Sequence, residues 1–251
     1  MTGRATTAII TGASSRLGDA LARDLSAHGW QLILHANANK TKADQLAQEL
    51  PTSSAVITSD LTNPDDLASF IDRASVPYGL PDILINNASI FEDDGIGSLD
   101  PALFDAHFAI HTKAPLFLSN DMATRLAADK RAMIVNVIDQ RVWKLTPQAM
   151  SYTLSKSALW SATQVLAQAL APRIRVNAIG PGPSFKNERQ SQEEFDKQTG
   201  AVPLGRGPNP DSFGRTVRYL WDSPSVTGQM IALDGGQHLA WQTPDVIGVG
   251  E

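Results

Sequence analysis

Seven short apolar runs recur along this chain, and stretches with helical character separate them. The runs are continuous rather than alternately apolar and polar, which is typical of strands buried on both faces of a parallel sheet. A strand–helix–strand order throughout predicts a doubly wound α/β sheet with right-handed crossovers and with helices on both faces. The seven runs comprise residues 8–11, 31–35, 55–58, 83–86, 133–138, 174–178 and 230–233.

The segments between the runs carry helix signals. Residues 16–28 place leucine and alanine on one face, as an amphipathic helix does. Asn63 precedes Pro64 and two aspartates, which predicts a helix start because Asn caps a helix, Pro fits its first turn and acids favour its N-terminus. Residues 152–169 are rich in alanine and leucine, and Pro172 follows them, which predicts a long helix that ends there.

Length and composition limit the class of protein. A chain of 251 residues without a linker-like or repeated segment predicts one domain over residues 1–251. A net charge of −5 without a basic cluster argues against nucleic acid as a partner, and the lack of cysteine excludes disulfides and thiolate chemistry. No apolar run approaches the roughly 20 residues that span a bilayer, and the N-terminus lacks the apolar core of a secretion signal. We therefore expect a cytoplasmic protein with no membrane partner.

Two segments depart from the alternation of strands and helices. Residues 183–210 are rich in proline and glycine, and so long an irregular stretch in a compact domain is usually a functional lid or disordered. We expect this lid to carry substrate choice. Arg175, Lys186 and Arg206 are candidates for contact with an acidic substrate tail, or are surface charges. The tail, residues 237–251, carries Trp241 and is either frayed or docked on a neighbouring subunit.

Tyr152 and Lys156 lie four residues apart at the start of the expected long helix, and Tyr152 follows Asp139 by thirteen residues. Residues four apart share one helix face. A lysine cation beside a phenol favours the phenolate, so we expect Lys156 to lower the pKa of Tyr152 towards the range that a general acid needs. By itself, Tyr-x-x-x-Lys is more often an ordinary pair on a helix, so this prediction depends on the other motifs.

A glycine-containing turn lies between the first expected strand and the first expected helix. Small residues at such a turn let the backbone approach a ligand, and a helix N-terminus favours an anion. The spacing is not that of the G-x-G-x-x-G fingerprint, and a turn that is merely rich in glycine is the alternative. We expect cofactor contacts from Thr11, Gly12, Ser14, Arg16, Leu17 and Gly18.

The end of the second expected strand bears on the choice of nicotinamide cofactor. An acid at this place accepts bonds from a ribose 2′-hydroxyl and selects NAD. Here the strand ends in His35-Ala-Asn37 without an acid, and Arg16 is well matched to a 2′-phosphate, so we expect NADP(H). Lys40 and Lys42 offer further positive charge, or are solvated residues at a helix start.

Two further strand ends face the same expected crevice. Asp60-Leu61 closes the third strand, where the acid is either a contact for the adenine amino group or a turn residue. Asn86-Asn87-Ala88 closes the fourth strand, at the edge where open α/β sheets bind their ligands.

Together these motifs resemble the short-chain dehydrogenase/reductase family over roughly residues 5–238. The resemblance implies a single-domain Rossmann fold with a seven-stranded parallel sheet, hydride transfer from a nicotinamide, and commonly a homotetramer. It implies that the tyrosine is the acid and that the lysine binds the nicotinamide ribose and tunes the tyrosine. The motifs that carry it are Thr11-Gly12 with Gly18, Asn86-Asn87-Ala88, Tyr152 with Lys156, Pro181-Gly182 and Asp234-Gly235-Gly236. The cofactor contacts that it implies are His35, Asn37, Asp60, Leu61, Asn87, Ala88, Tyr152, Lys156, Pro181, Gly182 and Ser184.

The chain departs from the common family pattern at three positions. Arg16 replaces the middle glycine of the turn, Asp139 stands where most relatives have a serine, and His111 stands where most have the asparagine of the proton relay. The arginine, the aspartate and the sequence Asn86-Asn-Ala-Ser-Ile-Phe91 resemble pteridine reductases, and the histidine resembles the bacterial dihydromonapterin/dihydrofolate reductase branch. The substrate contacts that this implies are Arg16, Ser89, Phe91, Asp139 and Tyr152.

The chemistry of the residues favours a pterin-like substrate as well. A carboxyl group such as Asp139 suits a ring with several nitrogens, because it accepts an N–H bond or, if protonated, donates one. Phe91 can stack on a flat heteroaromatic ring. The alternatives are a turn carboxylate at Asp139 and a loop residue covering the core at Phe91. No metal site is expected, since His107 and His111 lack carboxylate or cysteine partners.

The sequence therefore predicts an NADPH-dependent reductase that transfers hydride to a C=N bond of a dihydropterin such as dihydromonapterin, dihydrobiopterin or dihydrofolate. Tyr152 is the expected acid, with Asp139 and Lys156 in support. One alternative is a carbonyl or 3-oxoacyl reductase of the same family that merely tolerates Asp139. Another is a sensor or scaffold that binds NADP(H) without useful turnover, although such a protein has no need of a tuned phenol.

Overall fold

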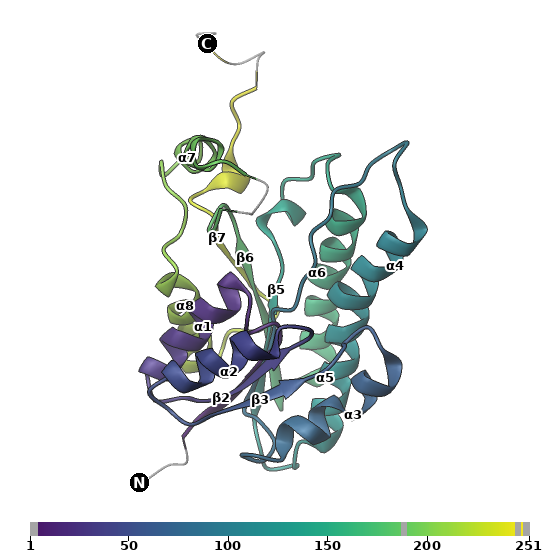
Figure 1. Ribbon diagram of the computed structural model, residues 1–251, viewed down its shortest axis with the longest axis vertical. Helices are drawn as coiled ribbons and strands as arrows, with labels where there is room; N and C mark the ends of the chain where they lie inside the picture. Colours follow the sequence, from purple (N-terminus) through teal and green to yellow (C-terminus); the bar gives the residue numbers. More distant parts are fainter. Residues whose placement is uncertain (1–4, 187–189, 244–246, 248–251) are drawn as a thin grey trace.

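The computed structural model describes residues 5–186, 190–243 and 247. Its centre is a seven-stranded sheet in the order β3-β2-β1-β4-β5-β6-β7, in which all neighbouring strands are parallel (Figure 1). Each predicted apolar run overlaps one strand, so the predicted doubly wound sheet is confirmed. The strands are β1 (Thr7–Ile10), β2 (Gln31–Ala36), β3 (Ser54–Thr58), β4 (Ile83–Asn86), β5 (Ala132–Val137), β6 (Ile174–Pro181) and β7 (Met230–Leu233).

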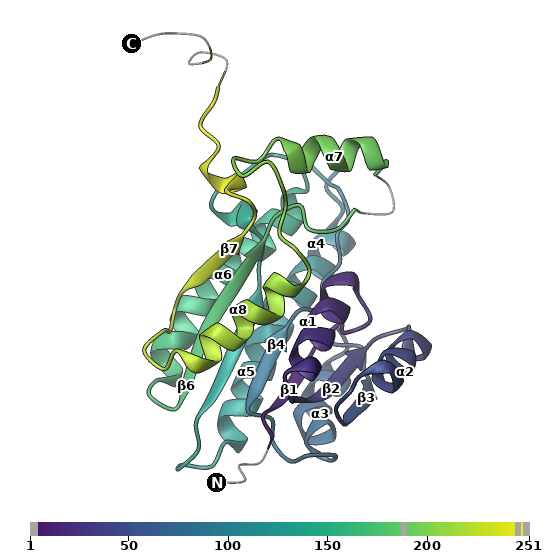
Figure 2. The same cartoon turned by 90° about the vertical axis from the view of Figure 1, so that its left-hand side faces the viewer.

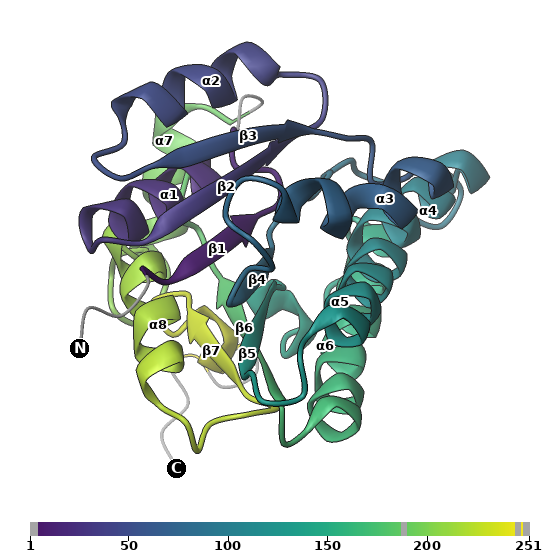
Figure 3. The same ribbon diagram turned by 90° about the horizontal axis from the view of Figure 1, so that it is seen from below.

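Helices cover both faces of the sheet. On one face α1 packs against α8, and α2 lies beside β2 and β3; on the other face lie α3, α4, α5 and α6 (Figure 3). None of the described helices is both long enough and apolar enough to cross a bilayer. The helices are α1 (Arg16–Ala27), α2 (Lys40–Glu49), α3 (Pro64–Ser75), α4 (Pro101–Phe108), α5 (Ala114–Arg125), α6 (Met150–Leu170), α7 (Gln192–Gly200) and α8 (Asp211–Asp222).

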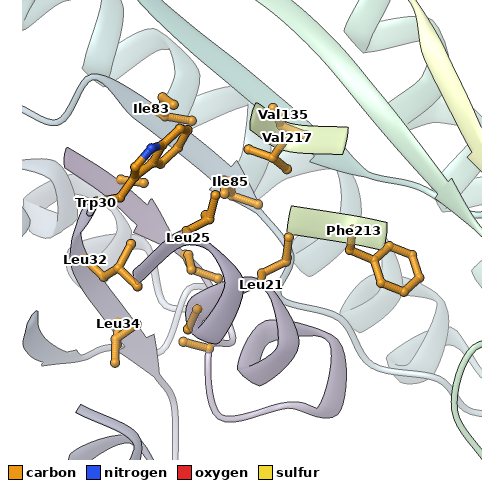
Figure 4. Close-up of a cluster of buried hydrophobic side chains, with 14 of the residues drawn as sticks. Leu21, Leu25, Trp30, Leu32, Leu34, Ile83, Ile85, Val135, Phe213 and Val217 are labelled. Carbon is orange, nitrogen blue, oxygen red and sulfur yellow. The ribbon is translucent and has the colours of Figure 1, made fainter. Parts of the chain in front are cut away.

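The sheet buries a separate hydrophobic cluster on each face, because successive side chains of a strand point in opposite directions. On the α1 and α8 side, Leu21 and Leu25 pack with Phe213 (Figure 4). On the other side, Ile9 packs with Phe70 of α3. Each such fully buried side chain contributes roughly 1.5–3 kcal/mol. The two clusters hold the strands rigidly, so the residues that follow their carboxyl ends have fixed positions.

Helix starts follow the predicted signals. The Asn63 side-chain oxygen accepts the main-chain N–H of Asp65 at 2.9 Å and of Asp66 at 3.2 Å, which caps α3. The long helix α6 begins at Met150, two residues before Tyr152. Tyr152 and Lys156 therefore lie in its first two turns, close to the edge of the sheet where ligands bind.

The predicted lid is less irregular than its composition suggested. A capping box between Ser191 and Glu194 starts α7, which lies near the ends of β6 and β7 (Figure 2). The described tail begins with a short turn, Gln237–Leu239, in which His238 Nδ1 lies 2.6 Å from Asp234 Oδ2. Trp241 is exposed. Residues 187–189 of the lid, and residues 244–246 and 248–251 of the tail, lie outside the described part of the chain.

Candidate active site

A cavity of about 580 Å³ opens at the carboxyl ends of the strands. The segments after β1, β4, β5 and β6, together with the start of α6, line it. This is the place where open α/β sheets bind their ligands. The predicted site residues in its lining are Arg16, Leu17, Asn87, Ser89, Phe91, Asp139, Tyr152, Lys156, Pro181, Gly182 and Ser184.

The three predicted catalytic residues meet in this cavity. The Tyr152 hydroxyl donates to Asp139 Oδ2 at 3.0 Å. The other carboxylate oxygen, Oδ1, accepts the main-chain N–H of Arg141 at 2.8 Å, which fixes the plane of the carboxylate. Lys156 Nζ donates to the Val137 carbonyl at 2.9 Å and lies 5.8 Å from the centre of the Tyr152 ring. A phenol, a carboxylate and an ammonium thus lie within one wall of the cavity.

The electrostatics of this trio differ from the expectation. Burial raises the pKa of Tyr152 well above its usual value, and the charge of Asp139 raises it further. Burial also raises the pKa of Asp139, and it lowers the pKa of Lys156 to about 8. The prediction that Lys156 lowers the pKa of Tyr152 is wrong for this state, because loss of hydration and the nearby carboxylate both disfavour a phenolate. Tyr152 is a neutral phenol that points its proton at Asp139.

The rings of Phe91 and Tyr152 form a contacting pair in the cavity, which we call the aromatic clamp. The Phe91 ring stands nearly perpendicular to the Tyr152 ring, at 80°, with 4.8 Å between the ring centroids. Phe91 is 46% exposed, so it does not cover the core. The Arg141 guanidinium carbon lies 5.8 Å from the centre of the Phe91 ring and 5.9 Å from that of Tyr152. Sequence reasoning missed Arg141, although its place two residues after Asp139 was an available signal.

The glycine turn packs closely against the loop after β4. Gly12 has φ 63°, and a Cβ atom there would lie 2.9 Å from Ala88 Cα. Thr11 Oγ1 accepts the main-chain N–H of Asn87 at 2.8 Å and of Ala88 at 2.9 Å. A Cβ on Gly18 would meet the Gly12 carbonyl oxygen, so this helix turn also requires glycine. The turn is therefore held by its own bonds, with the start of α1 at the cavity.

His35 is one of the predicted cofactor residues that do not line the cavity. It is 2% exposed, and its Nδ1 accepts the Gly12 N–H at 3.1 Å. Nε2 therefore carries the proton and donates to the Ser59 carbonyl at 2.9 Å. Burial lowers the pKa of His35, which keeps the ring neutral. The expected direct cofactor contact is corrected: both ring nitrogens bind protein backbone, and His35 holds the glycine turn against β2 and β3.

Four further predicted cofactor residues, after β1, β2 and β3, are absent from the cavity lining. Asn37 is exposed at the end of β2, and Ser14 is half-buried in the glycine turn. Asp60 Oδ1 accepts the Thr62 N–H at 2.9 Å and the Thr62 hydroxyl at 2.7 Å, which favours the turn-residue alternative for Asp60. Leu61 beside it is buried.

The segment after β6 completes the rim. The Ser184 hydroxyl donates to the Gly182 carbonyl at 2.9 Å. A Cβ on Gly182 would lie 2.6 Å from the Asp234 Cα, so the backbone here runs against the Asp234 segment. This close approach explains the glycine at position 182, and Pro181, Gly182 and Ser184 line the cavity.

His111 joins the loop after β4 to α6. It lies in a π-helical turn, Ala109–Lys113, between α4 and α5. Its Nε2 accepts the Ile90 N–H at 3.3 Å and lies 2.8 Å from the Ser89 hydroxyl oxygen. Nδ1 therefore carries the proton and donates to the Ser155 hydroxyl at 2.8 Å. Because burial lowers its pKa strongly, His111 is a neutral bridge between the Ser89 loop and the catalytic helix.

Two aspartates of the loop after β4 cap the catalytic helix from outside. Ala149, at the N-cap of α6, has φ 47° and supplies no capping side chain. Instead the Ala149 N–H donates to Asp93 Oδ1 at 2.9 Å, and the Ser151 N–H donates to Asp94 Oδ1 at 2.9 Å. The Asp94 carbonyl accepts the Met150 N–H at 3.1 Å. The loop that carries Ser89 and Phe91 is therefore bound to the helix that carries Tyr152.

Replacing Asp94 with alanine should disturb stability and catalysis together. It removes a cap and leaves a buried N–H without a partner, so we expect Tm to fall by about 2–6 °C. We also expect a higher KM for substrate, because Phe91 is no longer fixed relative to Tyr152. Thermal unfolding followed by circular dichroism and steady-state kinetics measure the two effects.

Two variants serve as controls for this prediction. Asp94→Asn keeps an oxygen that can accept the Ser151 N–H, so its Tm should fall less, and its KM should rise less, than those of Asp94→Ala. Asp100→Ala removes the cap of α4, where Asp100 accepts the Ala102 N–H at 2.7 Å, and should lower Tm while leaving KM unchanged. Equal KM values for Asp94→Ala and wild type would contradict a positioning role for this cap.

A Rossmann sheet whose ligand crevice holds a hydrogen-bonded phenol and a buried lysine points to the oxidoreductase class. The family model described as enoyl-(acyl carrier protein) reductase, which represents short-chain dehydrogenases/reductases, matches residues 12–238. The chain belongs to the short-chain dehydrogenase/reductase family, which confirms the resemblance found in the sequence.

Individual relatives carry descriptions of more than one activity. Two solved structures of FolM alternative dihydrofolate reductase 1, from Brucella canis and Brucella suis and both in complex with NADP, are similar with a TM-score of 0.93. They are 49% and 50% identical to this chain, cover 96% of it, and are themselves covered to 97% and 98%. The curated 3-oxoacyl-[acyl-carrier-protein] reductase FabG of Rickettsia bellii is 28% identical over 235 residues, which cover 92% of this chain and 95% of that protein.

Proposed function

We propose that this protein is an NADPH-dependent reductase that adds hydride to a C=N bond of a dihydropterin. The observation that carries the proposal is the 3.0 Å hydrogen bond from the Tyr152 hydroxyl to Asp139, beside the exposed Phe91 ring. A carboxylate in the place of the usual serine suits a nitrogen-rich ring better than a ketone oxygen. The similarity to the FolM structures supports the same reading.

The residues around the glycine turn fit NADP(H). The start of α1 lies at the cavity and favours a phosphate, with Ser15, Arg16 and Leu17 in the lining. Arg16 is exposed, and its guanidinium matches phosphate oxygens. The exposed Asn37 puts no negative charge at the end of β2, where an acid would repel a 2′-phosphate. When bound, NADPH would supply the hydride, and we assign Lys156 to its nicotinamide ribose.

Tyr152 supplies the proton. A phenol with a raised pKa keeps its proton at neutral pH and is therefore ready to donate it. A ring nitrogen that has just gained an electron pair through hydride addition to C=N is a much stronger base than a phenolate, so the transfer is downhill. Asp139 orients the phenol before the reaction and can then accept an N–H of the ring. Phe91 presses on the flat ring from the side of the loop after β4.

The second candidate is a carbonyl or 3-oxoacyl reductase. The observation that favours it is the similarity to FabG over most of both chains. In that case Asp139 would orient the same phenol towards a ketone oxygen. The two candidates use one proton donor and differ in what the carboxylate recognises.

Steady-state NADPH oxidation with four substrates decides between these candidates. We expect turnover of dihydromonapterin, dihydrobiopterin and dihydrofolate, and at least about tenfold lower kcat/KM for a 3-oxoacyl thioester. We also expect NADPH to be preferred over NADH, since the end of β2 carries no acid. Activity confined to the thioester would replace the proposed function with the second candidate. Binding of NADPH without turnover of any substrate would favour a sensor or scaffold.

We further propose a homotetramer, which the family resemblance implied. Support comes from large apolar side chains on the outer surface of the α4, α5 and α6 layer. Phe117 of α5 is 53% exposed, and Leu154 and Val165 of α6 are 49% and 62% exposed. Subunit contacts would remove this apolar surface from water.

A further inference from the structure

Three cationic side chains line the cavity within the described part of the chain, and the proposed function uses two of them. Arg16 and Lys156 serve the cofactor in that proposal. Arg141 has no part in it, although it lies against both rings of the aromatic clamp. Among the described residues that line the cavity, Asp139 is the single carboxylate. The substrate end of the cavity therefore has a positive charge whose task the hydride and proton transfers do not explain.

The position of Arg141 is fixed from both of its ends. Its main-chain N–H donates to Asp139 Oδ1 at 2.8 Å, and its side-chain Nη1 donates to the Gln148 carbonyl at 3.0 Å. Gln148 is uncharged, so this bond leaves the positive charge of the guanidinium in place. A guanidinium has five N–H donors, and one bond to Gln148 leaves enough of them for a two-bond contact with a carboxylate. The side chain is thus held in place and still able to bind an anion.

We propose that Arg141 forms a subsite for a carboxylate carried on the side chain of the substrate, which makes folate-type dihydropterins with an acidic tail the favoured substrates. This inference rests on the proposed function. Phe91 and Tyr152 contact each other, with 4.8 Å between their ring centroids, so the flat ring lies against this pair and not between its members. Both rings lie within 6 Å of the guanidinium carbon, at 5.8 and 5.9 Å. A substituent that leaves the ring on this side meets Arg141 first. The neutral side chains of Gln190, Gln198 and Gln237 also line the cavity and add no charge that would repel an acid.

The cations that the sequence offered for such a tail are placed elsewhere. Arg175 donates to the carbonyl oxygens of Leu220, Ser223, Val226 and Trp221, where it ties β6 to the end of α8. Lys186 and Arg206 are absent from the described lining of the cavity. Of these four described cations, Arg141 is the one that lines the cavity and keeps available donors.

The test compares Arg141→Gln with wild type on two substrates at saturating NADPH. Dihydrofolate carries carboxylates on its tail, and dihydrobiopterin carries an uncharged one. We expect KM for dihydrofolate to rise about tenfold or more, which corresponds to the loss of one charge-assisted contact. KM for dihydrobiopterin should change by less than about threefold, since only packing against Phe91 is lost. Arg141→Lys should recover part of the dihydrofolate affinity, because it restores the charge without the planar fork.

Lys144→Gln is the matched control, because Lys144 lies exposed on the same loop and outside the cavity lining. It removes the same charge and should leave both KM values unchanged. Two results for Arg141→Gln would overturn the subsite: an equal rise in KM for both substrates, or a shifted pH profile of kcat on both. Either result would make Arg141 a residue that positions Asp139 and Tyr152. If the wild-type protein reduced neither substrate, that result would instead count against the proposed function itself.

Discussion

Tyr152→Phe should abolish most turnover while leaving cofactor binding intact. The change removes the hydroxyl that donates to Asp139, at 3.0 Å, and keeps the ring that contacts Phe91. General acid catalysis contributes about 10²–10⁴-fold, so we expect kcat for a dihydropterin to fall at least about 100-fold. NADPH affinity, measured by fluorescence titration, should stay within about threefold, because the phenylalanine fills the same space.

Tyr219→Phe is the control for this experiment. Tyr219 lies on α8 with 56% of its surface exposed, away from the cavity, so loss of its hydroxyl should leave kcat unchanged. Wild-type rates in Tyr152→Phe would remove this tyrosine from the role of proton donor. Circular dichroism of the variant separates a chemical effect from a folding defect.

Asp139→Ser should change the class of substrate. A serine hydroxyl can still accept the Arg141 N–H, but it brings no negative charge and no second oxygen to the substrate ring. We expect kcat/KM for dihydropterins to fall by at least about 100-fold, in line with loss of a charged hydrogen-bond partner and of phenol alignment. We expect reduction of small ketones to rise, because the hydroxyl suits a carbonyl oxygen. Parallel assays of one dihydropterin and one ketone measure the ratio of the two kcat/KM values in the variant and in the wild type.

Asp139→Asn separates charge from shape in this second prediction. The amide keeps the size of the carboxylate and one acceptor oxygen, so it should lose dihydropterin activity without gaining ketone reduction. Unchanged dihydropterin turnover in Asp139→Ser, together with no gain on ketones, would show that Asp139 does not set substrate class. The pair of variants thus distinguishes recognition of the ring from simple support of Tyr152.

The sheet could be predicted from the sequence because strands buried on both faces leave continuous apolar runs. The meeting of Asp139 and Tyr152 could be anticipated from family-like spacing. The direction in which the Tyr152 pKa shifts could not be predicted, because it depends on how completely the fold buries the phenol and on which charge lies nearest. A lysine four residues away was visible in the sequence, whereas the extent of burial was not.

Other features of the site could not be predicted from the sequence because they depend on contacts between distant residues or because their signal was obscured. The position of His35 at a strand end predicted a cofactor contact. Its side chain instead points inward, because its ring nitrogens form hydrogen bonds with the main chain of Gly12 and Ser59. The Asp93 and Asp94 caps join residues more than 50 positions apart, and no local pattern reports such a pairing. The start of α7 did have a signal, Ser191 followed by Glu194, but the surrounding prolines and glycines obscured it.

The external cap of α6 has a consequence for how this enzyme can diversify. In most proteins a binding loop can be exchanged without moving the residues that perform the chemistry. Here a transplanted loop that lacked either aspartate would leave the first turn of the tyrosine-bearing helix without its acceptors. Evolution or protein engineering of a new preference must therefore alter the loop while retaining its two carboxylates, or provide the helix with a capping side chain of its own.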